Sequence, residues 1–246
     1  MKLPCFAAPP AASGVRSLQA KSPAWPGGVT PFGSDAAHAV VAISCCMRWG
    51  QDKIHVGTIG EINDSEETMI AKFFDLVETH TPQLVSWNGG GFDLPVLHYR
   101  GLIHGVRAPR YWDMGEGYHK DSREFKWNNY ISRYHSRHLD LMDLLAMYQP
   151  RASAPLDDLA QLMGLPGKLG MSGAHVWDAF QAGKLADISN YCQTDVVNTY
   201  LVYLRFQLMR GMLTADQHRA QCELVRDTLG KSAEPHWKEF LGRWKH

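Results

Sequence analysis

The sequence lacks several features that would place it in a specialised class of protein. Its 25 basic and 25 acidic side chains cancel, so no overall charge indicates binding to nucleic acid across the whole surface. No apolar run is long enough to cross a membrane, and prolines interrupt residues 1–10 before an export signal could form. We therefore expect a cytoplasmic protein with no membrane partner.

Cysteine is also scarce and poorly placed for cross-linking. The five cysteines are an odd number, they include no Cys-x-x-Cys pair, and adjacent Cys45 and Cys46 cannot easily bridge each other. This usage indicates a reducing compartment. The 246 residues, 45% of them hydrophobic, are enough to bury one substantial core. A shift in composition predicts a poorly ordered extension rich in Pro, Ala, Gly and Ser over residues 1–37, followed by one domain over residues 38–246.

A glycine-rich turn is the most informative feature that is present. Residues 88–93 read Asn-Gly-Gly-Gly-Phe-Asp and follow the apolar segment 83–87, which predicts a short buried strand. Pro95 fits the first turn of a helix, so Asp93 lies at a strand-to-helix junction. The glycines permit positive φ and a close approach by another backbone, such as a nucleic-acid strand. An ordinary turn with Asp93 as the helix N-cap is the alternative.

A second acidic motif lies in a predicted long helix. Residues 185–209 contain no Gly or Pro and carry apolar side chains at helical spacing. Tyr191 and Asp195 are four residues apart and therefore share one face of this helix. A carboxylate there suits a divalent metal ion, and a phenol suits a water or a phosphate oxygen. The alternative is a surface aspartate beside a half-buried tyrosine.

The two motifs, in this order, resemble those of the tyrosine-bearing DEDD exonucleases. Further stretches make the chain, over about residues 39–211, similar to predicted 3′-to-5′ exonucleases related to the proofreading domain of family-B DNA polymerases. These stretches are residues 138–145 (His-Leu-Asp-Leu-Met-Asp-Leu-Leu), 156–160 (Leu-Asp-Asp-Leu-Ala), 162–168 (Leu-Met-Gly-Leu-Pro-Gly-Lys) and 191–200 (Tyr-Cys-Gln-Thr-Asp-Val-Val-Asn-Thr-Tyr).

The resemblance implies an α/β fold of the ribonuclease-H-like type, with a mixed central sheet flanked by helices. It implies a site for two Mg²⁺ or Mn²⁺ ions in which Asp93 and Asp195 bind metal and Tyr191 positions the attacking water. Carboxylates are the ligands that these hard cations prefer. The expected substrate-binding residues are Asn88, Gly91, Phe92 and Lys168, although a solvated loop position is the alternative for Lys168.

The first motif of the family, Asp-x-Glu at the end of a first strand, is missing from its expected place. Residues 1–38 contain only one acid, Asp35, and predict no strand before the apolar segment 39–44. Residues 64–66 spell Asp-Ser-Glu, but Asp64 as N-cap with Glu67 three residues later is typical of a helix start. The metal site is therefore expected to be incomplete. Either the sequence begins downstream of the true first strand, or the protein has lost these ligands.

A stretch rich in cations and aromatics, residues 98–138, has two interpretations. It carries eight Lys or Arg against four acids, interleaved with eight Tyr, Trp or Phe. Cations neutralise phosphates and aromatic rings stack on unpaired bases, which favours a surface that handles a nucleic-acid strand. The alternative is a long insertion whose aromatic side chains pack beneath it.

These observations predict a metal-dependent 3′-to-5′ exonuclease that acts on single-stranded 3′ ends, of DNA more than RNA. The alternative function is a catalytically impaired nucleic-acid-binding module on the same fold.

Overall fold

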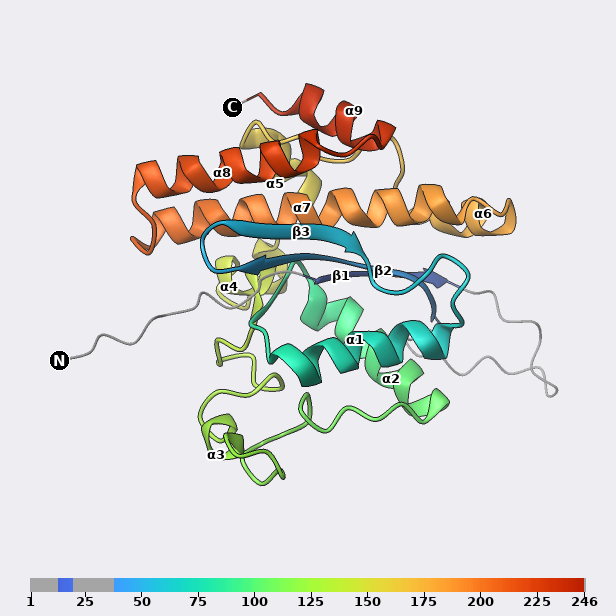
Figure 1. Ribbon diagram of the computed structural model, residues 1–246, viewed down its shortest axis with the longest axis vertical. Coiled ribbons are helices and arrows are strands. Elements are labelled where there is room, and N and C mark those ends of the chain that lie inside the picture. Colours follow the sequence, from blue (N-terminus) through green and yellow to red (C-terminus); the bar gives the residue numbers. More distant parts are fainter. Residues whose placement is uncertain (1–12, 20–37, 246) are drawn as a thin grey trace.

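Among residues 13–19 and 38–245, which the computed structural model describes, five strands form the centre of the molecule (Figure 1). Strands β1 (Ser13–Gln19), β2 (His38–Trp49) and β3 (Lys53–Thr58) form an antiparallel sheet in the order β1-β2-β3. Strands β4 (Leu84–Ser86) and β5 (His138–Asp140) form a parallel pair, and β1 also contacts β4. The predicted mixed α/β class is confirmed, although the strands form two hydrogen-bonded groups instead of one continuous sheet.

Helices cover both faces of the β1–β3 sheet because β2 is apolar on both of its faces. Cys45 and Met47 of β2 pack into a core with α1 (Glu66–His80) and α2 (Leu94–His104). Cys46, between them, packs into a core with α7 (Leu185–Met209), α8 (Ala215–Gly230) and α9 (Pro235–Arg243). Successive side chains of a strand point to opposite faces, so one apolar strand supplies both cores. The result is the three-layer arrangement visible in Figure 1.

Shorter helices complete the described chain. They are the single π-helical turn η2 (Gly89–Asp93), α3 (Ser122–Phe125), α4 (Leu141–Leu145), η3 (Pro150–Ala152), α5 (Leu156–Leu162), η4 (Gly173–His175) and α6 (Val176–Gln181). None of the helices in the described ranges has the length and apolar character needed to cross a bilayer.

The N-terminal segment differs from its prediction in one respect. The sequence predicts no strand before residue 39, yet residues 13–19 form β1, paired with β2 from Ser13 opposite Cys45 to Gln19 opposite His38. Propensity misses this strand because its seven residues include three Ser or Gly and gain their place by pairing with β2. The remainder of the predicted extension, residues 1–12 and 20–37, lies outside the described residues. Its poor order stays a prediction.

The acids at residues 64–66 have structural roles that differ in detail from the prediction. The N-cap of α1 is Ser65, whose side chain accepts a hydrogen bond from the Thr68 N–H, so the prediction of Asp64 as N-cap is wrong. Asp64 instead accepts from the Glu61 N–H at 2.7 Å and pairs with Lys72.

Glu66 joins three elements. Its Oε1 accepts from the Val40 N–H and from Nε of Arg100, both at 2.7 Å, and its Oε2 contacts Nε2 of His104 at 2.7 Å. Burial alone would raise the pKa of Glu66, but hydrogen bonds from Arg100, Val40 and His104 outweigh burial and hold this pKa below its ordinary value. Glu66 is therefore occupied in fastening α1 to β2 and α2.

Candidate functional site

The glycine-rich turn follows β4 directly, but its glycines act differently from the expectation. The left-handed conformation falls on Asn88, with φ of 62°, and none of the three following glycines has positive φ. A Cβ at Gly89 would lie 2.4 Å from Cβ and Oγ of Ser86, and one at Gly91 would lie 2.4 Å from Oδ1 of Asn88. The glycines are therefore required for close approach within the turn, and asparagine, which tolerates positive φ better than most residues, supplies the sharp reversal.

Asp140 holds this turn from the neighbouring strand. Its Oδ1 accepts a hydrogen bond from the Asn88 N–H at 2.9 Å, and its Oδ2 accepts from the Gly90 N–H at 2.8 Å. Burial raises the pKa of Asp140 above its ordinary value, although these hydrogen bonds act in the opposite direction. From the sequence, Asp140 is expected to open an apolar run close to the acidic centre, without being a principal metal ligand. Its position at the end of β5, which runs parallel to β4, explains why Asp140 reaches the turn. The carboxyl ends of parallel strands lie at the same edge of a sheet, so residues that follow the two strands come close together.

Asp93 lies where η2 passes into α2. Its backbone is helical, with φ of −62° and ψ of −48°, and its side chain makes no capping hydrogen bond. Asp93 therefore occupies the N-cap position of α2, as the alternative interpretation expected, but its side chain does not cap the helix. Proline stands in the first turn of α2, as predicted from Pro95.

The second acidic motif lies in α7, whose bounds agree with the predicted helix of residues 185–209. Tyr191 is 5% exposed and Asp195 is 6% exposed. The alternative of a surface aspartate beside a half-buried tyrosine is therefore wrong. Strand β1 contacts both η2 and α7, so the elements that carry Asp93 and Asp195 meet at the same strand.

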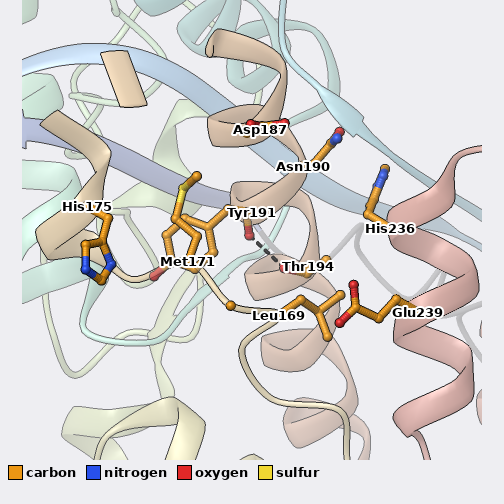
Figure 2. Close-up of a pocket in the computed structure, with 10 residues that line it drawn as sticks. Leu169, Met171, His175, Asp187, Asn190, Tyr191, Thr194, His236 and Glu239 are labelled. Carbon is orange, nitrogen blue, oxygen red and sulfur yellow. Dashed lines mark hydrogen bonds between the residues drawn. The ribbon is translucent and has the colours of Figure 1, made fainter. Parts of the chain in front are cut away.

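Tyr191 faces a cavity of about 360 Å³ between α7, α9 and the loop that precedes η4 (Figure 2). The Oγ1 of Thr194 donates to the carbonyl oxygen of Tyr191 at 2.8 Å. Burial lowers the pKa of His236, which lines the α9 side. The other lining residues are Leu169, Gly170, Met171, His175, Asp187, Asn190 and Glu239. The lining contains two acidic side chains, Asp187 and Glu239, and no Lys or Arg, so the cavity suits a polar, hydrated ligand more than an apolar one.

The loop on one side of this cavity is fastened by Asn198 of α7. The Asn198 amide accepts from the Gly167 N–H at 3.3 Å and donates to the Gly167 carbonyl at 2.9 Å. Lys168 follows directly and is half-buried, and its N–H donates to Asp157 at 2.7 Å. Lys168 itself does not line the cavity, although the next three residues do.

The predicted substrate-binding residues of the turn lie at a second cavity, of about 560 Å³. Asn88 and Gly91 line it, on the side of the turn that faces β5. Phe92 does not line this cavity and packs edge-on against the ring of His38, with ring centroids 5.3 Å apart. Of the predicted site residues, Tyr191 lines the first cavity and Asn88 and Gly91 line the second. The other four, namely Asp93, Asp195, Phe92 and Lys168, line neither cavity.

Residues 98–138 combine both interpretations that the sequence left open. Four of the eight cations have internal partners: Arg100 with Glu66, Arg110 with Asp121, Arg133 with Asp143, and Arg137 with the Asn128 carbonyl. Tyr111, Phe125 and Tyr130 are buried. The remaining cations and aromatics are exposed, namely Arg107, Lys120, Arg123, Lys126, Tyr99, Trp112, Tyr118, Trp127 and Tyr134.

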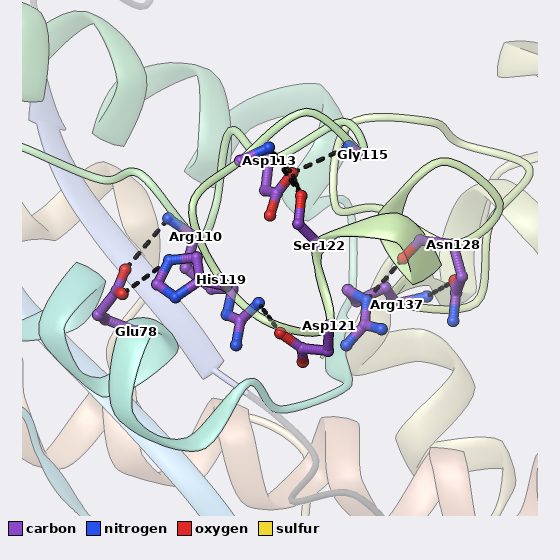
Figure 3. Close-up of polar contacts among 10 residues, drawn as sticks. Glu78, Arg110, Asp113, Gly115, His119, Asp121, Ser122, Asn128 and Arg137 are labelled. Atoms are coloured by element: carbon purple, nitrogen blue, oxygen red, sulfur yellow. Dashed lines mark hydrogen bonds and ion pairs between the residues drawn. The ribbon is translucent and has the colours of Figure 1, made fainter.

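Polar contacts also fasten this stretch to the domain (Figure 3). Asp113 is buried and accepts from the Gly115 N–H, the Gly117 N–H and the Ser122 hydroxyl. Burial alone would raise the pKa of Asp113, but these hydrogen bonds hold it below its ordinary value. Glu78 of α1 accepts from the Arg110 N–H. The stretch is an ordered layer with an exposed basic and aromatic surface.

The carboxylates present do not complete a two-metal site. In residues 13–19 and 38–245, no three His, Cys, Asp or Glu side chains form a metal-binding group. The sequence of β1 is Ser-Gly-Val-Arg-Ser-Leu-Gln, without a carboxylate. Two-metal sites need a cluster of oxygen ligands. The described residues therefore provide Asp93 and Asp195 but not the full ligand set that the resemblance implies.

Comparison with known proteins agrees with the sequence motifs. A family model described as a predicted 3′-5′ exonuclease related to the exonuclease domain of PolB matches residues 30–244. The match begins after β1 and includes both acidic motifs. No curated protein matches the chain. Because the match spans most of the sequence, the chain belongs to the family of predicted 3′-5′ exonucleases related to the PolB exonuclease domain.

Proposed function

We propose that the protein is a metal-dependent 3′-to-5′ exonuclease that hydrolyses single-stranded 3′ ends, of DNA more than RNA. The observation that supports this most strongly is that η2, which ends at Asp93, and α7, which carries Tyr191 and Asp195, meet at β1. Family membership supplies the type of reaction. We also propose a cytoplasmic location, which suits the free thiols of Cys45, Cys46 and Cys222.

In this proposal each residue has a separate role. Asp93 and Asp195 are the carboxylates that hold Mg²⁺ or Mn²⁺, which when bound would acidify the attacking water and stabilise the departing 3′ oxygen. Tyr191 orients the water through its hydroxyl, because a phenol with a pKa of about 10 is protonated at neutral pH. Asp140 positions the turn through the Asn88 and Gly90 N–H groups.

The substrate strand is proposed to contact the turn and the loop after α5. Asn88 and Gly91 lie at a cavity, Phe92 follows them, and Lys168 lies in the loop that Asn198 fastens. The exposed cations and aromatics of residues 98–138 would extend this contact along the strand, because stacking and phosphate neutralisation together bind single strands without sequence preference.

A catalytically impaired nucleic-acid-binding module is the second candidate function. A specific observation favours it: β1 contacts both acid-bearing elements and contains no carboxylate. Without the first-strand carboxylates, a two-metal site loses negative charge that is needed to bind the metal ions. The surfaces proposed to contact the nucleic-acid strand would remain.

Cleavage of a single strand labelled at its 3′ end tests both candidates. The wild-type protein, Asp93→Asn and Asp195→Asn are compared with Mg²⁺ or Mn²⁺ on DNA and on RNA. For an active nuclease we expect each substitution to slow label release by more than about 100-fold. The matched control is Asp216→Asn, at an exposed position of α8 whose side chain is 92% accessible, and it should cleave like wild type.

The outcomes separate the candidates. Equal cleavage by all variants would contradict the assignment of Asp93 and Asp195. No cleavage by the wild type, together with binding to the strand, would support the impaired module. A faster reaction on RNA would reverse the proposed preference for DNA.

A further inference from the structure

The cavity beside the turn has the size and the lining of a site for one base. Its volume of about 560 Å³ lies within the range of about 300–1,000 Å³ that is usual for small-ligand pockets. Aromatic rings of Tyr111, Trp112, Tyr130 and Tyr148 form part of its wall. Trp112 is 49% exposed, so part of its indole is accessible from solvent. Flat aromatic surfaces of this kind stack on nucleobases.

Tyr148 reaches this wall through strained backbone. Met147 and Tyr148 are successive non-glycine residues with φ of 51° and 59°. Left-handed backbone at such residues is uncommon, is strained, and often accompanies a functional site. The ring is then held between two neighbours, with the Arg133 guanidinium 4.7 Å from its centre and the Tyr134 ring centroid at 5.4 Å.

The polar groups of the cavity suit a neutral ligand better than a phosphate. Arg133 pairs with Asp143, and Asp140 adds a second carboxylate, so the wall carries no surplus positive charge. Nε2 of His98 is buried, and within the described ranges it has no hydrogen-bond partner. Burial, with a smaller effect of His138, lowers the pKa of His98 to about 4, so this ring is neutral at physiological pH. The neutral imidazole therefore adds no positive charge to the wall that would favour a phosphate.

The remaining wall is the turn itself. Gly90 and Gly91 line the cavity next to Asn88, and both glycines are exposed. Without side chains they leave room for the sugar and phosphate attached to a base inside the cavity. The same turn ends at Asp93, so a strand whose base enters here passes close to the proposed reacting end.

We propose that this cavity binds one unpaired nucleobase of the single strand, stacked against Trp112 and Tyr148 with its polar edge toward Asn88. This inference rests on the proposed function, because it assumes that a nucleic-acid strand crosses the turn. The pocket extends that function by assigning one nucleotide of the strand to a defined site.

Binding without catalysis tests the pocket. Single-stranded DNA of about ten nucleotides is titrated in EDTA, first intact and then with one abasic position moved along the strand. For the wild type we expect roughly tenfold weaker binding when the abasic position coincides with the pocket, since stacking contributes about 1–3 kcal/mol per base. Trp112→Ala should weaken binding of the intact strand by a similar factor and remove the sensitivity to position.

The matched control is Trp127→Ala, which truncates a tryptophan of the same stretch that is 76% exposed and does not line the cavity. It should keep the sensitivity to the abasic position. Tyr148→Ala provides a second variant, with far-UV circular dichroism and the midpoint of thermal unfolding to verify folding of each protein. Trp112→Phe should retain most of the binding.

Uniform sensitivity along the strand, equal loss of this position sensitivity in Trp112→Ala and Trp127→Ala, or no binding by the wild type would each overturn the proposal. Cleavage is measured separately with metal present. Cleavage without position-specific binding would support the exonuclease and reject the pocket. Position-specific binding without cleavage would support the pocket and reject the exonuclease.

Discussion

Two sides of the site hold their acids by different means. On the turn side, made of β4, η2 and β5, Asp93 depends on contacts between segments far apart in the sequence, since Gly90 and Asp140 are separated by 50 residues. On the helix side, α7 holds Asp195 one turn from Tyr191 within a single continuous helix. The turn side is therefore expected to be sensitive to loss of tertiary contacts, and the helix side to changes on one buried face.

The two sides of the site also differ in the contacts that stabilise them. The turn side places two neutral histidines around the turn: the buried His138 of β5 lies 2.8 Å from Oγ of Ser86, and the half-buried His98 lies in α2. The helix side relies on apolar packing of α7, with the Asn198 amide fastening one loop. Three changes, in decreasing order of expected effect, test this difference.

Acidification should destabilise the turn side most. Burial lowers the pKa of both His98 and His138 to about 4, below 6.5 in the unfolded chain. The unfolded chain therefore takes up protons first, so the contribution to stability is complete above pH 6.5 and is lost as the pH falls to about 4. Urea unfolding at fixed pH values should show a loss on the order of 3 kcal/mol from the buried His138 in this window, and a smaller additional loss from the half-buried His98.

His138→Gln sharpens the test, because glutamine can still bond the Ser86 hydroxyl but does not titrate. The variant should lose less stability than wild type between pH 6.5 and 4. An unchanged pH dependence would show that His138 is not the group responsible.

Asn198→Ala tests the helix side. It leaves the buried N–H and carbonyl of Gly167 without their side-chain partner and removes a side chain that is 1% exposed. We expect a loss of about 2 kcal/mol in the free energy of unfolding. Asn63→Ala, at an exposed loop position, is the control and should change this free energy by less than about 0.5 kcal/mol. Equal losses in both variants would argue against the fastening role of Asn198.

Asp140→Ala should have the smallest effect on stability but a clear effect on activity. The exposed Gly90 N–H can bond water after the substitution, so we expect a loss of about 1 kcal/mol. Because the turn would no longer be fixed, cleavage should fall by about tenfold. Asp158→Ala, an exposed acid of α5, should leave both measurements unchanged. Full cleavage by Asp140→Ala would show that Asp140 does not position the turn.

The helix side could be predicted from the sequence, and so could the local elements of the turn side, but not the long-range contacts that hold the turn. Helix α7 has the predicted bounds because helical periodicity is local and regular. The role of Asp140 depends on β5 pairing with β4, which no local pattern specifies. Trp112 belongs to the cationic and aromatic stretch predicted to contact a strand, but its meeting with Tyr148 could not be predicted, since segments distant in sequence bring the two to one cavity.

Smaller differences have equally physical causes. Asp64 and Ser65 are both good capping residues, and the hydrogen bond from the Thr68 N–H decides for Ser65. The glycines of the turn predicted positive φ, but in the structure they are required because a Cβ atom would collide with Ser86 or Asn88. Composition alone does not distinguish these two uses of glycine.

Strand β1 has a consequence for how such an enzyme gains or loses its chemistry. It occupies the edge of β2 by main-chain pairing, which most side chains permit. Its sequence can therefore change while β2 and the two flanking acid-bearing elements stay in place. A protein can therefore keep this fold while losing the metal ligands of its first strand. Conversely, an engineer could pair an acidic strand with β2 without redesigning the turn or the long helix.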